Sequence, residues 1–177
     1  PAVADAMGIP ASQCNDDIEV LSLRGKLVDL NGISRIVTSL KSGRYQLIIL
    51  DSFYRAMPAG VSENENAAIM ALYNTIDYVT MTMNTSWVNI HHASKGGQGD
   101  KAVTDVGAGA GAQSRAADTH IVLRPHEEED IVVMESAPRS FAKMVPLSLR
   151  WTFPLWHPID ADPSKIKGRL NPKEERR

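Results

Sequence analysis

The amino-acid sequence predicts an α/β protein with a mainly parallel sheet that is flanked by helices and has antiparallel strands toward its C-terminal edge. Short apolar runs alternate with longer segments of helical periodicity, which indicates crossovers between parallel strands. The run YQLIIL at residues 45–50 is almost wholly apolar, which is typical of a strand buried on both faces of such a sheet. Nearer the C-terminus, two apolar runs flank the acidic stretch HEEED, which predicts an antiparallel hairpin.

The first half of the chain alternates between β-type and helical patterns. Residues 18–23 (IEVLSL) partly alternate apolar and polar side chains, and Asp29 or Asn31 lies where the cap of the following helix is expected. The expected order is a strand at 18–23, a helix at 29–40, a strand at 45–50, a helix at 63–84 and a strand at 87–90. The longer helix is expected to bury one stripe, formed by Ile69, Leu72, Tyr73, Ile76, Val79, Thr80 and Met83.

The second half begins with a long segment that is rich in glycine and alanine. Such a segment has few large apolar side chains to bury, so a loop is expected there. The expected order is a loop at 94–111, a short helix at 113–117, strands at 119–123 and 131–135, and one further strand within 141–153. Residues 1–157 are expected to form one domain, and the polar residues 158–177 a tail or linker.

Composition excludes several classes of protein. The chain has 177 residues, enough for one well-buried domain, and its formal net charge of -2 provides no overall basic field for nucleic acid. The single cysteine, Cys14, excludes an intrachain disulfide and fits a reducing cytoplasm. No apolar run approaches the roughly 20 residues that span a bilayer. The chain begins with Pro1 rather than methionine, so we expect it to be part of a longer protein.

An aspartate ends the most apolar run of the chain. Asp51 follows LIIL and therefore lies at the C-terminal end of an expected parallel strand, where open α/β sheets bind their ligands. A carboxylate at that position can hold Mg²⁺, and the metal ion then bridges nucleotide phosphates. Many buried strands also end in an aspartate that only caps the next turn. The motif alone leaves both interpretations open.

A histidine pair follows the next expected strand. His91 and His92 come directly after WVNI and precede a glycine-rich segment. Adjacent strand residues point to opposite faces, so the two rings are not expected to bind one ion. The chain also lacks the HExxH and CxxC spacings of zinc sites. The pattern favours one histidine that points toward a site, where it senses a phosphate or positions a water, and one that packs.

Two further features have low specificity by themselves. The alternating glycines and alanines of residues 107–112 let backbone N–H groups approach an anion, or form a flexible connection before a helix. Arg139 follows the expected strand at 131–135. An exposed arginine there is usually solvated surface, and it gains a role when a neighbouring subunit brings a nucleotide to it.

In their order along the chain, these features resemble the RecA-like ATPases of the RepA-like hexameric replicative helicase family of plasmids and phages. A strand-end aspartate is followed by a strand-end histidine with a lysine close behind it. A Gly/Ala-rich segment ending in Ala-Ala-Asp comes next, and then a strand pair followed by an arginine. The resemblance covers about residues 18–156.

The resemblance implies a nucleotide site built from residues of this chain. Asp51, with Ser52 beside it, matches the second nucleotide-binding motif, whose aspartate is associated with Mg²⁺ and ATP. His92, or else His91, matches the polar residue that couples the state of the γ-phosphate to the DNA-facing loop. Arg139 matches the position from which these hexamers extend a finger to the nucleotide of the neighbouring subunit.

The resemblance also implies partners. Residues 96–112 fall where the family has its central DNA-binding loop, with Lys95 and Lys101 as the basic candidates. A member of this family is expected to be a cytoplasmic homohexamer that couples ATP hydrolysis to movement on single-stranded DNA. Residues 1–157 would then be a partial RecA-like core.

The sequence departs from the family pattern in two places. It contains no GxxxxGK[ST] phosphate-binding loop, so the chain by itself is expected neither to bind ATP tightly nor to hydrolyse it. Ala137 stands two residues before Arg139, where related hexamers often carry lysine. The chain is then either part of a longer ATPase, which its start favours, or a degenerate domain that acts in binding or assembly. A third interpretation is a metal-dependent hydrolase built on Asp51, His91, His92 and Asp118.

Overall fold

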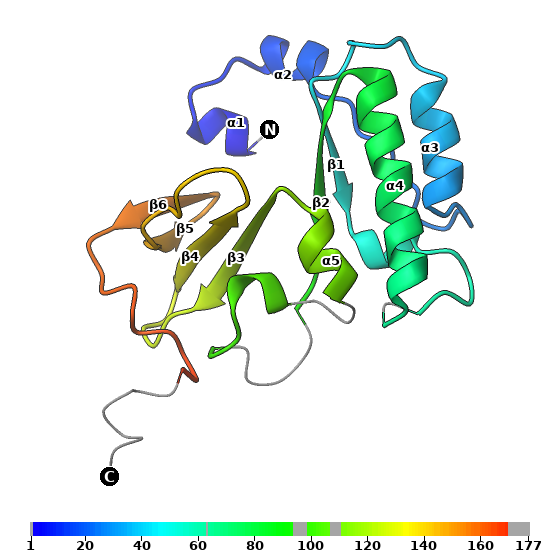
Figure 1. Cartoon of the computed structure of the whole chain (residues 1–177). Helices are drawn as coiled ribbons and strands as arrows, with labels where there is room; N and C mark the ends of the chain where they lie inside the picture. Colours follow the sequence, from blue (N-terminus) through cyan, green and yellow to red (C-terminus); the bar gives the residue numbers. More distant parts are fainter. Residues whose placement is uncertain (1, 63, 94–98, 107–110, 170–177) are drawn as a thin grey trace. The chain divides into compact units, whose positions relative to one another are not determined.

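The computed structural model describes residues 2–62, 64–93, 99–106 and 111–169, which divide into two compact units. Unit 1 comprises Pro1–Arg24, Gly97–Val103 and Ile121–Arg177, and unit 2 comprises Gly25–Gly96 and Thr104–His120. Both helices and strands are present (Figure 1), so the expectation of a mixed α/β protein is confirmed at this coarse level. Among the helices of these ranges, none has the length and apolar character that crossing a membrane requires.

Unit 2 contains a parallel strand pair joined through a helix. Strand β1 (Leu47–Asp51) leads through the 3₁₀ turn η1 (Phe53–Ala56) to helix α4 (Asn66–Met83), which leads to strand β2 (Ser86–Ile90). The two strands pair in parallel from Leu47 opposite Ser86 to Asp51 opposite Ile90. The predicted strand–helix–strand crossover is confirmed here.

Helices α3 (Leu30–Thr38) and α4 pack against each other and supply the core of unit 2 (Figure 1). Helix α3 begins after Asp29, whose carboxylate accepts a hydrogen bond from the backbone N–H of Gly32 at 2.9 Å. It buries Leu30, Ile33 and Val37. The predicted stripe of α4 is confirmed except at Thr80, which is only half-buried. The buried side chains of α4 are Ile69, Leu72, Tyr73, Ile76, Val79 and Met83.

Within unit 2, the strand pair is covered on one face only. Its inner face carries the half-buried side chains of Ile48, Leu50 and Trp87. The opposite face leaves its aliphatic side chains 38 to 59 % exposed, and these are Leu47, Ile49, Val88 and Ile90. The prediction that the 45–50 run is buried on both faces is therefore wrong for this structure. A purely apolar run does not reveal whether a second layer is present to cover it.

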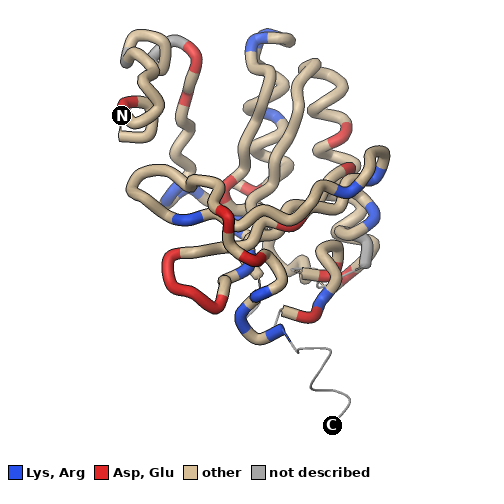
Figure 2. Tube along the Cα trace, turned by 90° about the vertical axis from the view of Figure 1, so that its left-hand side faces the viewer, with Lys and Arg blue, Asp and Glu red and all other residues tan. Residues whose placement is uncertain are grey.

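Unit 1 is built on a four-stranded sheet in the order β3-β4-β5-β6. The predicted acidic hairpin joins the first two strands, and its turn is the unbroken red segment of Figure 2. The third and fourth strands pair antiparallel from Ser148 opposite Ile159 to Thr152 opposite Leu155. The strands are β3 (Thr119–Pro125), β4 (Ile131–Pro138), β5 (Leu147–Thr152) and β6 (Leu155–Ile159).

The strands do not form the single, mainly parallel sheet that the sequence predicts. In the described residues, two strands are parallel in one sheet and four form a separate antiparallel sheet. The difference arises in the second half of the chain, where the connections between successive strands are too short for a parallel crossover and return the chain antiparallel. Strand β6, which was not expected, is the edge strand of this sheet and tolerates Pro158 in it.

The N-terminal residues also differ from expectation. Two short helices, α1 (Ala2–Ala6) and α2 (Ala11–Asp17), precede residues 18–23, which form no strand. Side chains that an alternating strand would bury, such as those of Ile18 and Val20, are exposed. The local pattern for a strand is present, but residues 18–23 have no ladder partner in the described chain, and a strand needs such a partner to exist.

Residues 158–169, expected to belong to a polar tail or linker, pack against the sheet of unit 1. Ile166 is only 1 % exposed and forms a β-bridge with His126. The buried ring of His126 places Nε2 3.0 Å from the carbonyl oxygen of Asp162. The backbone N–H and hydroxyl of Ser164 bond to the Asp162 carboxylate and lower its pKa. These contacts are long-range or turn-specific, so composition alone did not predict them.

Candidate functional site

The parallel pairing of β1 and β2 brings the aspartate and the histidine pair predicted from the sequence to one edge of unit 2. Asp51 is the last residue of β1 and lies opposite Ile90, the last residue of β2, so His91 and His92 begin at the same edge. Parallel strands present their C-terminal ends together, and this edge is where open α/β sheets bind ligands. Asp51 and the histidine pair, which are far apart in the sequence, therefore lie at the same edge.

Asp51 and Ser52 have contrasting surroundings. The side chain of Asp51 is exposed, on the face of the strand pair that carries Leu47 and Ile49. Ser52, which follows through a cis peptide bond, is buried. Phe53 is almost completely buried at the start of η1 and fixes the chain directly after the strand. The aspartate therefore projects from an anchored segment.

The two histidines have different environments. His91 is half-buried, and its ring centroid lies 6.4 Å from that of Phe53. Its buried Nδ1 has no hydrogen-bond partner among the described atoms. His92 is exposed. One ring is thus packed beside Phe53 and the other is exposed, and a ligand role for His92 stays a prediction.

The hydrolase interpretation gains no support from the geometry. Within the described ranges, no group of three histidine, cysteine, aspartate or glutamate side chains is placed to hold a metal ion. Asp118 lies in the chain between α5 (Gly111–Ala116) and β3.

A polar cluster that the sequence did not single out lies behind this edge. The hydroxyl of Tyr73, on α4, bonds to the side chains of Asn89 on β2 and Gln113 on α5. Burial raises the pKa of Tyr73, although the two hydrogen bonds act in the opposite direction. The Asn89 side chain also accepts from the indole N–H of Trp87 at 2.8 Å. The one sequence signal was Asn89, a polar residue within the otherwise apolar WVNI run.

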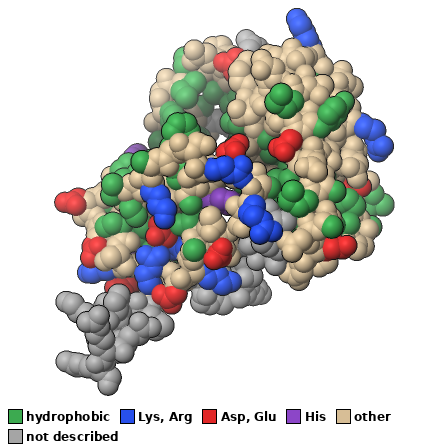
Figure 3. Space-filling model, viewed as in Figure 1, with side chains coloured by type: hydrophobic (Ala, Val, Ile, Leu, Met, Phe, Trp, Pro, Cys, Tyr) green, Lys and Arg blue, Asp and Glu red, His purple; other side chains and the backbone are tan. Residues whose placement is uncertain are grey.

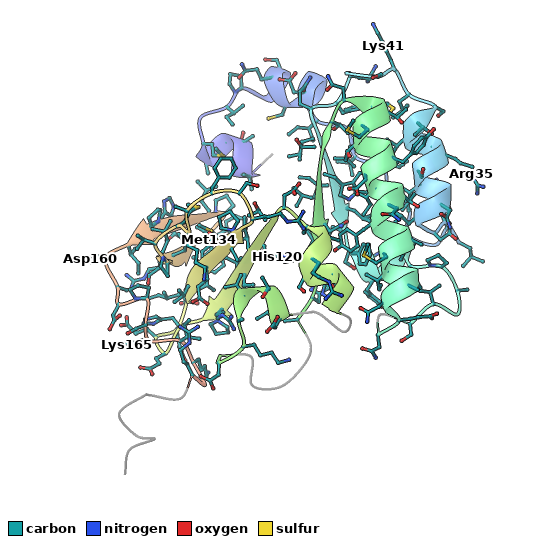
Figure 4. All side chains as sticks on the ribbon, in the orientation of Figure 1. Arg35, Lys41, His120, Met134, Asp160 and Lys165 are labelled. Carbon is teal, nitrogen blue, oxygen red and sulfur yellow. The ribbon has the colours of Figure 1, made fainter. Side chains whose placement is uncertain are left out.

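Helix α5 is held in unit 2 by contacts of its own residues and of a histidine that follows it. Gln113 takes part in the cluster just described, and helices α4 and α5 are in contact. His120, which Figure 4 labels just after α5, has its Nε2 3.1 Å from the carbonyl oxygen of Ser114. The segment after the Gly/Ala-rich stretch is therefore anchored in unit 2. Residues 107–110 of that stretch lie outside the described residues.

Of the remaining predicted site residues, two belong to unit 1 and one lies outside the described residues. Arg139 directly follows β4 in unit 1 and is exposed. Lys101 is also exposed and belongs to unit 1. Lys95 lies outside the described residues. On the face shown in Figure 3, lysines and arginines are interspersed with acidic and apolar side chains, so a nucleic-acid contact there would depend on individual basic residues.

Among the predicted site residues, the strand edge carries one exposed carboxylate, that of Asp51, and the described residues contain no group of three possible metal ligands. Mg²⁺ takes one or two carboxylates together with water and substrate phosphates, and the exposed Asp51 carboxylate is such a ligand. ATP requires a cradle for its phosphates, and the sequence contains no GxxxxGK[ST] loop to supply one. These residues alone therefore do not make a complete nucleotide site.

Comparison with known proteins does not place the chain in a family. A scan against protein-family models finds no match, and a search of curated proteins finds none either.

Proposed function

We propose that this chain is part of a RecA-like nucleotide-hydrolysing core of the RepA-like replicative helicase type. The observation that supports this most directly is the β1–α4–β2 crossover, which brings Asp51 and the two histidines to one edge of a parallel strand pair. Both the position of the edge and the residue types agree with a site for a metal-bound phosphate.

In this proposal each residue has a distinct role. Asp51 holds Mg²⁺, which neutralises phosphate charge when it is bound. His92, exposed beside the strand edge, contacts the terminal phosphate, while His91 packs on Phe53 and holds the turn. Arg139 acts on the nucleotide of a neighbouring subunit, and Lys95 and Lys101 contact single-stranded DNA.

The uncovered face of the strand pair is a second argument. Parallel sheets are nearly always covered on both faces, yet Leu47, Ile49, Val88 and Ile90 are 38 to 59 % exposed. A larger α/β core would bury this aliphatic surface. The phosphate-binding loop that this sequence lacks would then be supplied by the same additional polypeptide.

The first test is the sequence of the gene that encodes this chain. An open reading frame that encodes GxxxxGK[ST] upstream of this segment is expected. Its complete product should hydrolyse ATP, with stimulation by single-stranded DNA. Asp51→Asn should lower kcat by at least about a hundredfold, because metal-assisted charge stabilisation is lost. Asp77→Asn, on the exposed side of α4, is the matched control and should retain full activity.

The alternatives predict other results. A degenerate domain that acts in binding or assembly predicts no ATPase activity in the complete product, whichever aspartate is replaced. Full activity of the Asp51→Asn protein would refute the role assigned to Asp51. Stoichiometric zinc in the purified chain would revive the metal-dependent hydrolase and contradict the helicase proposal.

A further inference from the structure

Three charged side chains form a cluster in unit 1, outside the site described above, and two of them are largely buried while Arg169 is 31 % exposed. Arg124 on β3 is 3 % exposed and Glu135 on β4 is 15 % exposed, and the Arg124 Nε–H donates to the Glu135 carboxylate. From the C-terminal stretch, Arg169 places Nη2 3.2 Å from both oxygens of the same carboxylate. One glutamate thus joins two arginines that lie far apart in the sequence.

The same arginines hold the backbone of the segment at residues 99–103. Arg124 donates from Nη2 to the carbonyl oxygen of Lys101 at 2.6 Å, and Arg169 donates from Nε to the carbonyl oxygen of Gly99 at 2.9 Å. A planar guanidinium can bond a carboxylate and a carbonyl at once, which a lysine ammonium does less well. The cluster therefore fixes two alternate residues of this segment.

Gly99 fits against the chain so closely that no side chain can be added. A Cβ at this position would lie 2.7 Å from the backbone nitrogen of Arg169 and 2.8 Å from the carbonyl carbon of Gly168. Backbone atoms cannot move aside as a flexible side chain can, so any larger residue would displace the segment. At Gly99, close backbone approach thus acts together with the hydrogen bond from Arg169.

Burial of charged side chains generally adds little to the free energy of unfolding, because desolvation offsets their attraction. Well-packed apolar side chains often stabilise a core as much as a buried ion cluster does. What the cluster supplies is a defined geometry for the backbone of residues 99–103, while the side chain of Lys101 stays exposed. The two arginines and Lys101 outnumber Glu135 and the adjacent Asp100 by one positive charge. The exposed ammonium group of Lys101 is thus carried by a backbone of defined geometry.

We propose that Arg124, Glu135 and Arg169 are positioning residues that hold Lys101 as a contact for the phosphates of single-stranded nucleic acid. The proposal rests on the proposed function, since it identifies a residue of that binding surface. A lysine whose backbone is fixed loses less conformational freedom on binding than one in a mobile segment, so the clamp should raise affinity without touching the ligand itself.

The experiment measures binding of a fluorescein-labelled oligo(dT) to the chain by anisotropy over a range of salt concentrations. Lys101→Ala should weaken binding and reduce the slope of log K against log salt by about 0.7, the value for one phosphate contact on a single strand. Lys165→Ala makes the same charge change at an exposed position of unit 1, which Figure 4 labels, and should have a smaller effect.

Gly99→Ala tests the clamp without any change of charge. It should weaken oligo(dT) binding by roughly threefold to tenfold, through loss of preorganisation. Adding Lys101→Ala to it should weaken binding little further, because the two changes remove the same interaction. Trypsin cleavage after Lys101, followed by mass spectrometry, should be roughly tenfold faster in Gly99→Ala because local opening is easier. Arg169→Met should behave like Gly99→Ala in the cleavage assay.

Several results would overturn the proposal. One is equal weakening by Lys101→Ala and Lys165→Ala, and another is unchanged affinity in a Gly99→Ala protein that trypsin cleaves faster. Absence of oligo(dT) binding by the wild-type chain would overturn it as well. The ATPase test of Asp51 is independent of these outcomes, so a failure here is distinguishable from a failure of the proposed function. Lys101→Ala changes only an exposed side chain and keeps the test valid if Gly99→Ala does not fold.

Discussion

The hydroxyl of Tyr73 shows how one buried polar group connects three elements of unit 2. It bonds to Asn89 on β2 and Gln113 on α5, and its own residue lies in the core-facing stripe of α4. Desolvation is the largest influence on this hydroxyl and raises its pKa, so the neutral form is favoured in the folded protein. Stability contributed by this group should therefore depend on pH in the alkaline range.

The sign of the dependence follows from the raised pKa. The folded state holds the Tyr73 proton more tightly than the unfolded state, so the contribution is complete below the ordinary pKa of about 10 and is lost as pH rises through the folded value. Tyr73→Phe removes this dependence. It also removes the hydroxyl to which the side chains of Asn89 and Gln113 bond, which should cost about 1–3 kcal/mol at neutral pH.

Urea denaturation across the alkaline range measures both effects. The free energy of unfolding should fall more steeply with pH in the wild-type chain than in Tyr73→Phe. Tyr78→Phe, an exposed tyrosine on the same helix, serves as the matched control and should follow the wild type. Identical slopes for wild type and Tyr73→Phe would show that another group titrates.

At the scale of secondary-structure elements, helix α3 illustrates how local sequence sets a boundary. Asp29 has extended backbone geometry and accepts the N–H of Gly32 at 2.9 Å, which satisfies one of the unpaired donors of the first turn. Its carboxylate also lies at the positive end of the helix dipole. The apolar side chains Leu30, Ile33 and Val37 then follow at helical spacing and bury one face.

Removal of the cap should be measurable. Asp29→Ala is expected to lower the free energy of unfolding by about 1 kcal/mol, while Asp29→Asn, which retains an acceptor oxygen, should lose much less. Thermal and urea denaturation of the two variants provide the comparison. Equal losses in both variants would mean that the charge, and not the hydrogen bond, carries the effect.

At the scale of the whole molecule, the chain has core-forming helices and strands but lacks one recognisable part of the proposed nucleotide site. The strand edge carries Asp51 and the histidine pair. The phosphate cradle is missing from the sequence. Metal and nucleotide binding are usually cooperative in such sites because the phosphates complete the coordination of the ion.

The chain alone should therefore bind MgATP with a dissociation constant above about 1 mM, which corresponds to less than about 4 kcal/mol of binding free energy. Isothermal titration calorimetry of the purified 177-residue chain is the direct measurement. Micromolar binding would contradict the requirement for a separate phosphate-binding loop. The complete gene product, if it carries the loop, is the positive control.

The sequence by itself predicted the features that depend on neighbouring residues. Helix α3 and its cap, the buried stripe of α4 and the strands β1 to β4 all follow from local periodicity and turn chemistry. The shared edge of Asp51 and His91 was predictable too, because parallel strands joined by a helix end on the same side. Residues 18–23 show the limit, since a strand pattern forms no strand without a partner.

Only the tertiary structure decided what depends on residues distant in sequence. It showed that one face of β1–β2 is uncovered, that β6 completes a four-stranded sheet, and that residues 158–169 pack against that sheet. It also brought Arg169 to Glu135 and Gln113 to Tyr73, contacts that no periodicity encodes. Local pattern determines which residues are able to form an element, whereas burial and pairing are decided by the long-range contacts that the folded chain makes.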